Sequence, residues 1–183
     1  MAGLADPLVS TAWLAERLGD PTVRIVDATL PLVGQPGHGR DSYALGHIPG
    51  AVFFDINAIS DPDTELPHML PPPAVFAEAA GALGLDRRAT IVVYDAHGIY
   101  SAPRVWWTLR VMAYPRVFVL DGGLKAWRAE GRPLETAEAA PTTVEVEPAF
   151  DWRLVVDLAH VSDSLRSHTP QLVDARPAGR STA

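Results

Sequence analysis

The sequence predicts an α/β fold in which a parallel sheet of about five strands is covered by helices on both faces. Short apolar runs rich in β-branched residues alternate with segments of helical spacing, as in sheets whose strands are buried on both sides. The length of 183 residues, with 48% hydrophobic and 20% charged residues, suits one complete domain and is short for two. The apolar runs that we expect to be strands are Val23–Asp27, Ala51–Phe54, Ile91–Tyr94 and Val117–Leu120.

Four helices are expected beside these strands. Ser10 can cap the first, whose Leu14 and Leu18 lie four residues apart. Pro73 suits the first turn of the second helix, which Gly84 ends. The other two helices are expected at Ala102–Met112 and Leu124–Glu130, and long loops at Thr29–Gly46 and Asp61–Pro73.

The end of the chain repeats its beginning. Past Gly131 the composition shifts to Pro, Glu, Thr and Ala without apolar periodicity, which indicates a linker. When Leu8–Ala28 is placed over Val155–Ala175 without a gap, a helix cap, a helical spacing and a strand coincide, the last at Leu172–Ala175. We therefore expect a tandem repeat, with one domain at residues 8–133, a linker at 134–150 and the truncated start of a second domain at 151–183.

Charge and composition narrow the function classes. The net charge is −7, with 22 acidic and 15 basic residues, which argues against a nucleic-acid or anionic membrane partner. No apolar run reaches the roughly 18 residues of a membrane span, and the first residues do not resemble a signal peptide, so we expect a cytoplasmic protein. The chain has no cysteine, and its histidines lack metal-ligand spacing, so we expect neither a metal nor a cofactor.

A candidate site follows the strand Ile91–Tyr94. Asp95 begins a short glycine-containing loop, and a helix starts again near Ala102. In open α/β sheets ligands bind at the C-terminal ends of strands, where backbone N–H groups of the loop and the next helix can hold an anion. A thiolate nucleophile is excluded, because no cysteine is present.

Four motifs follow one another along the chain: Gly46-His47-Ile48-Pro49-Gly50-Ala51, the Asp95 loop, Leu120-Asp121-Gly122-Gly123 and Trp127. In this order and spacing they resemble the rhodanese sulfurtransferases. The resemblance covers about Val9–Pro133, and Gln171–Arg180 resembles the opening of a second rhodanese domain. The segment Tyr100–Trp107 resembles the two-domain mercaptopyruvate and thiosulfate sulfurtransferases more than the single-domain members.

This resemblance implies a rhodanese-like fold and a sulfur transfer. In the two-domain members a cysteine of the C-terminal domain carries sulfur as a persulfide, and the N-terminal domain is a degenerate copy. The sulfur donor is 3-mercaptopyruvate or thiosulfate, and the acceptor is a thiol or cyanide. This chain matches the N-terminal copy, so it is expected to pack against its own C-terminal rhodanese domain and to be inactive alone.

The resemblance also assigns residues. Asp95 stands where the active copy has its cysteine, so the expected catalytic residue is absent from this chain. His47 resembles a histidine that orients groups or relays protons near the partner domain's cysteine, with Asp41 as its acidic companion. Arg176 resembles an arginine that binds the mercaptopyruvate carboxylate.

Purely structural interpretations stand beside these roles. The His47 ring can bond a backbone carbonyl and fix the turn at Pro49-Gly50. Asp95 can accept N–H bonds of its loop at the entrance of a helix. Arg104 is expected to pair with Asp95 or Asp121 rather than with a ligand.

Two other functions stay open. Asp27, Asp95 and Asp121 all lie near the C-terminal ends of expected strands, where carboxylates could hold Mg²⁺ and let Asp95 accept a phosphoryl group. The absence of cysteine also suits a rhodanese-like binding or regulatory module without catalysis.

Overall fold

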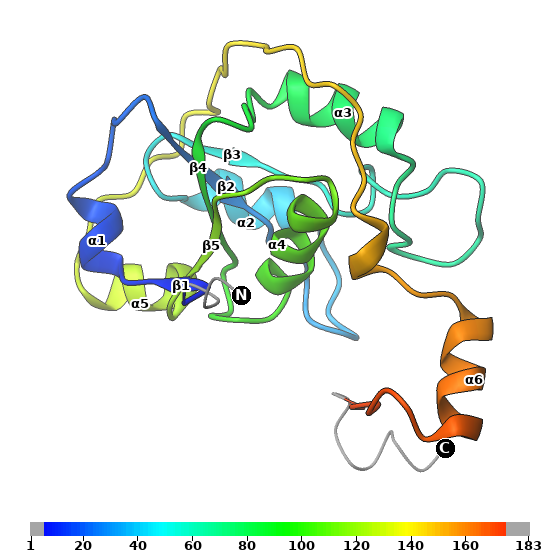
Figure 1. Ribbon diagram of the computed structural model, residues 1–183. Helices are drawn as coiled ribbons and strands as arrows, with labels where there is room; N and C mark the ends of the chain where they lie inside the picture. The colour runs from blue at the N-terminus through cyan, green and yellow to red at the C-terminus, as the bar shows by residue number, and fades with distance from the viewer. Residues whose placement is uncertain (1–5, 175–183) are drawn as a thin grey trace. The chain divides into compact units, whose positions relative to one another are not determined.

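The computed structural model describes residues 6–174 and contains a five-stranded parallel sheet (Figure 1). The strand order is β1-β5-β4-β2-β3, and every neighbouring pair is parallel, which confirms the predicted fold class. The strand missed by the sequence analysis, β1, has two residues and joins the sheet through Val119 and Leu120 of β5, too short a run to be recognised. The strands are β1 Leu8–Val9, β2 Val23–Asp27, β3 Ala51–Phe53, β4 Thr90–Tyr94 and β5 Val117–Leu120.

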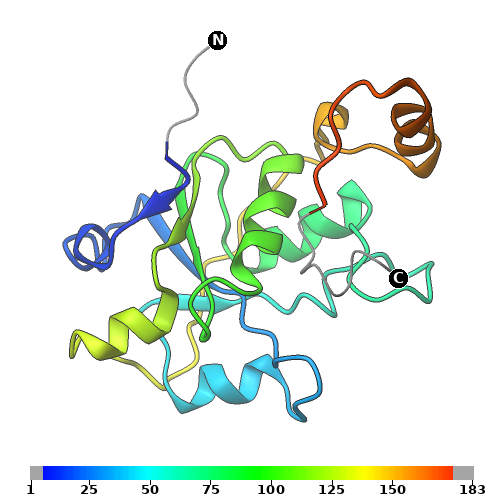
Figure 2. The same cartoon turned by 90° about the horizontal axis from the view of Figure 1, so that it is seen from below.

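Helices cover both faces of the sheet (Figure 2). Apolar residues of α3 and α4 pack on one face, and those of α1, α2 and α5 pack on the other. No helix in the described part of the chain is long and apolar enough to cross a membrane. The helices are α1 Thr11–Ala15, α2 Gly39–Leu45, α3 Pro73–Ala82, α4 Ala102–Val111, α5 Gly123–Ala129 and α6 Leu158–Ser167, with a 3₁₀ turn, η1, at Trp152–Leu154.

The expectation that Thr29–Gly46 is one long loop is wrong, because α2 lies within it. The Asp41 carboxylate accepts the backbone N–H of His38 (2.9 Å) and so holds the first turn. The buried ring of Tyr43 anchors the helix in the core. Gly39 is required where α2 meets the segment that follows β2, since a Cβ there would lie 1.8 Å from the Thr29 carbonyl oxygen. The sequence analysis missed this helix because glycines and prolines, which are typical of loops, are frequent in the residues around it.

The segment 134–150 lies on the first of the two compact units into which the chain divides, Met1–Phe150. Glu135 exchanges backbone hydrogen bonds with His47, at 2.9 Å each way, and Val144 donates to the Gly81 carbonyl (3.0 Å). Ala139, Val146 and Phe150 pack on the core. We call residues 134–150 the strap, because backbone bonds and apolar contacts fasten this extended segment to the unit.

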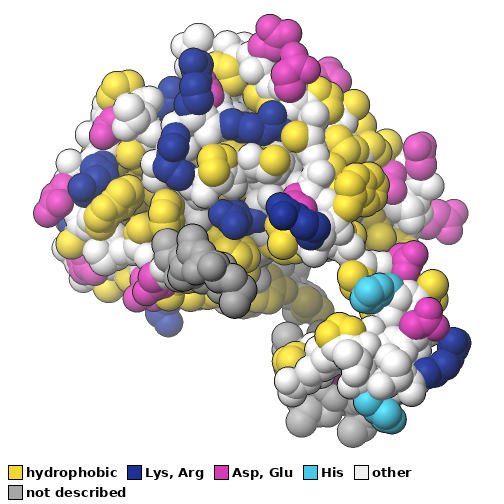
Figure 3. Space-filling view, viewed as in Figure 1, with side chains coloured by type: hydrophobic (Ala, Val, Ile, Leu, Met, Phe, Trp, Pro, Cys, Tyr) yellow, Lys and Arg dark blue, Asp and Glu magenta, His cyan; other side chains and the backbone are white. Residues whose placement is uncertain are grey.

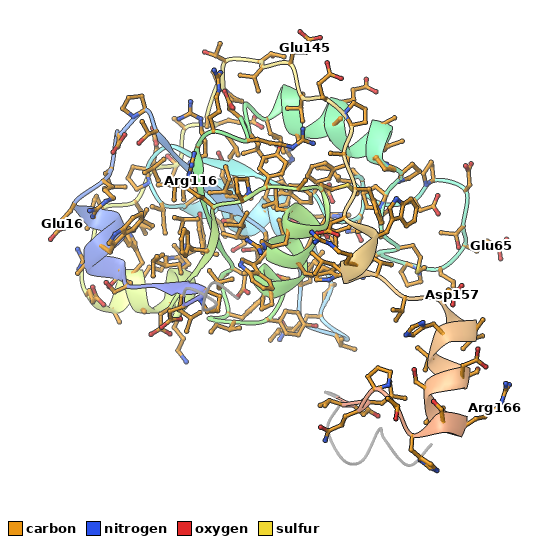
Figure 4. The ribbon with its side chains drawn as sticks, viewed as in Figure 1. Glu16, Glu65, Arg116, Glu145, Asp157 and Arg166 are labelled. Atoms are coloured by element: carbon orange, nitrogen blue, oxygen red, sulfur yellow. The ribbon has the colours of Figure 1, made fainter. Side chains whose placement is uncertain are left out.

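The second unit, described here from Asp151 to residue 174, contains the predicted helix α6. The Asp157 carboxylate caps it by accepting the N–H of His160 (2.8 Å), as the Ser10 hydroxyl caps α1 by accepting that of Trp13 (3.1 Å). Figure 4 shows Asp157 at the start of α6 and Arg166 near its end.

The predicted strand Leu172–Ala175 is not formed over residues 172–174, and Ala175 lies outside the described residues. The described part of this unit contains no strand with which to pair. Because a strand's N–H and C=O groups need partners, an isolated apolar run of this kind does not form one.

We expect Gly81→Ala to loosen the strap. A Cβ at Gly81 would lie 2.6 Å from the Val144 carbonyl oxygen. The clash should cost about 1–3 kcal/mol of unfolding free energy, although alanine favours a helix over glycine by about 1 kcal/mol. Chemical denaturation measures the change in unfolding free energy, and amide exchange at Val144 measures the loosening of the strap. The control Ala82→Gly, on the exposed side of α3, should lower stability through helix propensity alone and leave exchange at Val144 unchanged. A stabilised Gly81→Ala protein would contradict the expectation.

Candidate functional site

Asp95 organises the loop between β4 and α4. Its side chain is fully buried, and both carboxylate oxygens accept backbone N–H groups of the loop and of the first residue of α4. The interpretation that Asp95 accepts its own loop's N–H groups is therefore confirmed. The donors are His97 (2.8 Å) and Gly98 (2.9 Å) to Oδ1, and Tyr100 (2.7 Å), Ser101 (2.9 Å) and Ala102 (2.9 Å) to Oδ2.

These bonds decide what the loop can bind. The backbone donors that could hold a foreign anion already hold the Asp95 carboxylate. The same bonds occupy the oxygens that a metal or a phosphoryl group would need. Between residues 6 and 174 no group of three or more His, Cys, Asp or Glu side chains is placed to hold a metal. The geometry therefore gives no support to phosphoryl transfer through Asp27, Asp95 and Asp121.

His47 is fully buried and follows α2. Its Nδ1 lies 2.8 Å from the Tyr43 carbonyl oxygen, and its ring stacks on the Tyr43 ring with centroids 3.7 Å apart. The expected bond from this ring to a backbone carbonyl is thus present. A role for His47 in proton relay stays a prediction.

A second acid near His47 is Asp27, which ends β2 and pairs in register with Tyr94, whose hydroxyl accepts the N–H of Ile48. Asp41, the companion expected from the resemblance, bonds the start of α2, and its pairing with His47 stays a prediction. Asp27 is fully buried, and its Oδ1 accepts the N–H (2.9 Å) and the hydroxyl (2.5 Å) of Thr29. Burial raises the pKa of Asp27, while the Thr29 bonds, the Tyr94 hydroxyl and the His47 ring oppose that rise. The sequence could have indicated that Asp27 is buried, since alternate residues of a strand share a face and Val23 and Ile25 pack in the core.

Arg104 does not form the pair with Asp95 or Asp121 that the sequence suggested. Its Nη2 donates to the His68 carbonyl, and its guanidinium lies over the Trp107 ring, 4.9 Å from the centroid. Asp95 has no free oxygen to offer it, because the loop N–H groups fill both. Burial lowers the pKa of Arg104.

Arg104 is a cationic candidate to which the sequence analysis gave no ligand role. It lies in the first turn of α4, at the edge of the sheet where the Asp95 loop lies. Among residues 6–174 no carboxylate forms an ion pair with it. A guanidinium has five N–H donors, so Arg104 keeps donors for an anion. Arg176, expected to bind a carboxylate, lies outside the described residues.

Pockets open on the described part of the first unit, and two of them bear on the candidate site. One, of about 230 Å³, lies beside the Asp95 loop and is lined by residues that include Thr29, His38, Asp41 and His97. It is smaller than the roughly 300–1,000 Å³ usual for ligand sites. The other, of about 440 Å³, lies near the starts of β2 and β3, but its Glu135 side chain already accepts the Gly50 N–H (3.0 Å).

Basic side chains gather on one face of the molecule (Figure 3), and several arginines of the first unit bond backbone carbonyls. Arg24 donates to Gly84, and Arg87 donates to Met112, which follows α4. These arginines satisfy carbonyl groups near helix ends, which a helix cannot pair internally.

The model of the rhodanese-like domain family matches residues 10–130, which hold β2–β5, the His47 turn and the Asp95 loop. The chain belongs to the rhodanese family. The resemblance inferred from the motifs is thereby confirmed.

Relatives and solved structures agree with this membership. The chain is 42% identical over 176 residues to the 3-mercaptopyruvate sulfurtransferase of Escherichia coli K12, covering 96% of the chain and 63% of that relative. It is 38% identical over 185 residues to the human 3-mercaptopyruvate sulfurtransferase, covering 97% of the chain and 62% of the relative. The crystal structure of SseA from Escherichia coli superposes with a TM-score of 0.93 at 40% identity, over 98% of this chain and 69% of that one. The chain thus spans less than two thirds of the length of these two curated relatives.

We expect Asp95→Asn to destabilise the rhodanese domain strongly. The amide nitrogen of asparagine would face backbone N–H donors instead of accepting from them. Losing charge-assisted bonds and leaving buried donors unpaired should cost about 2–4 kcal/mol. The exposed Asp121→Asn is the matched control and should stay within about 0.5 kcal/mol of the wild type. Denaturant unfolding of both variants measures the difference, and equal stabilities would show that Asp95 does not hold the loop.

Proposed function

We propose that this chain is the non-catalytic rhodanese domain of a sulfurtransferase, with residues 8–133 as that domain and residues 151–183 as the start of a second one. The second domain would supply a cysteine and pack against the first. The sulfur donor would be 3-mercaptopyruvate or thiosulfate, and the acceptor a thiol or cyanide. The names of the relatives support the reaction class. The repeat is supported because α1 and α6 are each capped by a side-chain oxygen at the equivalent position.

The proposed reaction has two displacements. The cysteine thiolate of the second domain attacks the donor sulfur. With 3-mercaptopyruvate the C–S bond breaks, and its electron pair leaves as the pyruvate enolate, which takes up a proton. With thiosulfate the S–S bond breaks and sulfite leaves. The acceptor then attacks the outer sulfur of the persulfide, and the thiolate is restored.

The Asp95 loop is the observation that carries this proposal. A loop in the position of a rhodanese active-site loop is complete in this domain, but a carboxylate fills it. A carboxylate cannot carry sulfane sulfur, and the chain holds no cysteine that could. The domain therefore has the scaffold of the family without its nucleophile.

Within this proposal the basic side chains bind the anionic donor. Arg176, by its resemblance, would bind the carboxylate of 3-mercaptopyruvate through two charge-assisted hydrogen bonds. Arg104 is a second candidate, because its guanidinium has no carboxylate partner among residues 6–174. His47 and Asp41 would act on the shape of the site rather than on the sulfur.

A rhodanese-like binding or regulatory module is the second candidate. The filled Asp95 loop favours it equally if no cysteine-bearing domain accompanies this one. The cytoplasmic location expected from the sequence stays a prediction in either case.

The purified chain should produce no thiocyanate from cyanide and either donor above the rate in buffer. It has no thiol to form a persulfide. The product of the complete gene should be active if that gene encodes a second rhodanese domain with a cysteine. Colorimetric thiocyanate and pyruvate assays measure both. Activity of the chain alone would refute the proposal, and an inactive complete product would favour the binding module.

In an active full-length protein, Arg176→Ala should reduce turnover of 3-mercaptopyruvate more than His47→Ala does. Loss of a bidentate contact should cost about 1.5–3 kcal/mol, roughly tenfold to a hundredfold in kcat/KM. The buried His47→Ala change should instead lower the melting temperature. Steady-state kinetics and thermal melts separate the two. Wild-type kinetics for Arg176→Ala would remove that residue from the site.

A further inference from the structure

A buried polar cluster lies beneath the His47 turn. Asp27 and Tyr94 are register partners on β2 and β4, and both are fully buried. Tyr94 packs in the apolar cluster that α1, α2 and α5 form with the sheet, and the row of Val23 and Ile25 places Asp27 on the same face. A charged side chain in such a row is costly unless its oxygens have partners.

Most polar atoms of the cluster have partners. The Tyr43 carbonyl can only accept, so His47 Nδ1, at 2.8 Å, carries the hydrogen. The Tyr94 hydroxyl oxygen accepts the backbone N–H of Ile48 (3.2 Å). Asp27 Oδ1 accepts both polar groups of Thr29.

Two atoms of the cluster stand out. Neither Asp27 Oδ2 nor His47 Nε2 has a hydrogen-bond partner among the described residues, although both are buried. Asp27 pairs in register with Tyr94, whose hydroxyl accepts the N–H of Ile48, the residue next to His47, so both side chains border the same cluster. They do not bond each other. Leaving two such atoms unpaired would destabilise the folded protein. In native proteins, buried water molecules commonly bond such unpaired polar atoms where a site offers two to four polar partners.

We propose that Asp27, His47 and Tyr94 bind one internal water molecule. With His47 neutral and its hydrogen on Nδ1, Nε2 offers a lone pair, and Asp27 Oδ2 is a second acceptor. The two hydrogens of one water match these two acceptors. The Tyr94 O–H can donate to Asp27 or to the water oxygen, so the donors and acceptors of the cluster balance.

In this site both ring nitrogens of His47 have a defined hydrogen-bond partner. One ring nitrogen bonds a carbonyl of the preceding helix, and the other bonds the internal water. His47 would then be a positioning residue that ties the turn after α2 to β2, with no nitrogen left for a reacting group. This assignment does not depend on the proposed sulfur transfer.

The test uses the intact chain labelled with ¹⁵N-histidine. Long-range ¹H–¹⁵N correlation at neutral pH should show His47 hydrogen-bearing at Nδ1 and unprotonated at Nε2. Water-to-protein cross-relaxation should show a long-lived water near its ring. The signal can be assigned through His47→Gln or, if that variant does not fold, by substituting the other five of the six histidines in turn. A hydrogen on Nε2, or no long-lived water near the ring, would overturn the proposal.

A variant pair tests the role of Asp27. Asp27→Leu removes the Oδ2 acceptor and should abolish the water signal. Thr29→Val removes the hydroxyl bonds to Asp27 Oδ1 and from the Ala96 N–H, leaves Oδ2 in place, and should keep the water signal. A water signal that persists in folded Asp27→Leu protein would overturn the proposal, as would a high-resolution crystal structure without an ordered water between the two side chains. The wild-type measurement decides the question if Asp27→Leu does not fold.

Discussion

The bonding of one buried carboxylate by its own loop shapes the edge of the sheet where the candidate site lies. Asp95 draws five backbone N–H groups around itself, from His97 to the first residue of α4. These donors would otherwise be unpaired at the entrance of a helix. The loop is also bonded to the end of the neighbouring strand β2, because the Ala96 N–H donates to the Thr29 hydroxyl (3.0 Å), which in turn donates to Asp27. The Asp95 loop and the end of β2 therefore belong to one polar network, joined through Thr29.

The Asp95 loop differs from a catalytic loop in the origin of the charge that its N–H groups bind. In a catalytic loop, backbone N–H groups stabilise a charge that appears and disappears during the reaction. Here the carboxylate belongs to the chain itself, so the loop N–H groups are paired without a bound substrate or cofactor. The loop can therefore keep its shape in the absence of a ligand, with Arg104 in the helix that follows it.

Strong local patterns predicted most of the fold. The apolar strands, the caps of α1 and α6, and the helix after Asp95 follow from spacing and capping chemistry. The helix α2 was missed because a long-range contact, that of Gly39 with Thr29, decides where it packs. The sequence analysis also did not connect Asp27 with the region of His47. The register of β2 with β4 places Asp27 beside Tyr94, whose hydroxyl accepts the N–H of Ile48, and local spacing does not report such a pairing. Sequence patterns report local periodicity, whereas these contacts depend on how separate elements come together.

The strap has a consequence for effective concentration. If residues 134–150 were a flexible linker, the far end of those 17 residues would range over roughly 20–25 Å. The strap is instead held by the bond from Val144 to Gly81 and by the packing of Phe150 on the core. The chain therefore leaves the first unit at one defined place. Whatever follows Phe150 searches a much smaller volume around that exit. An intramolecular encounter between the two units gains in local concentration without any additional contact between them.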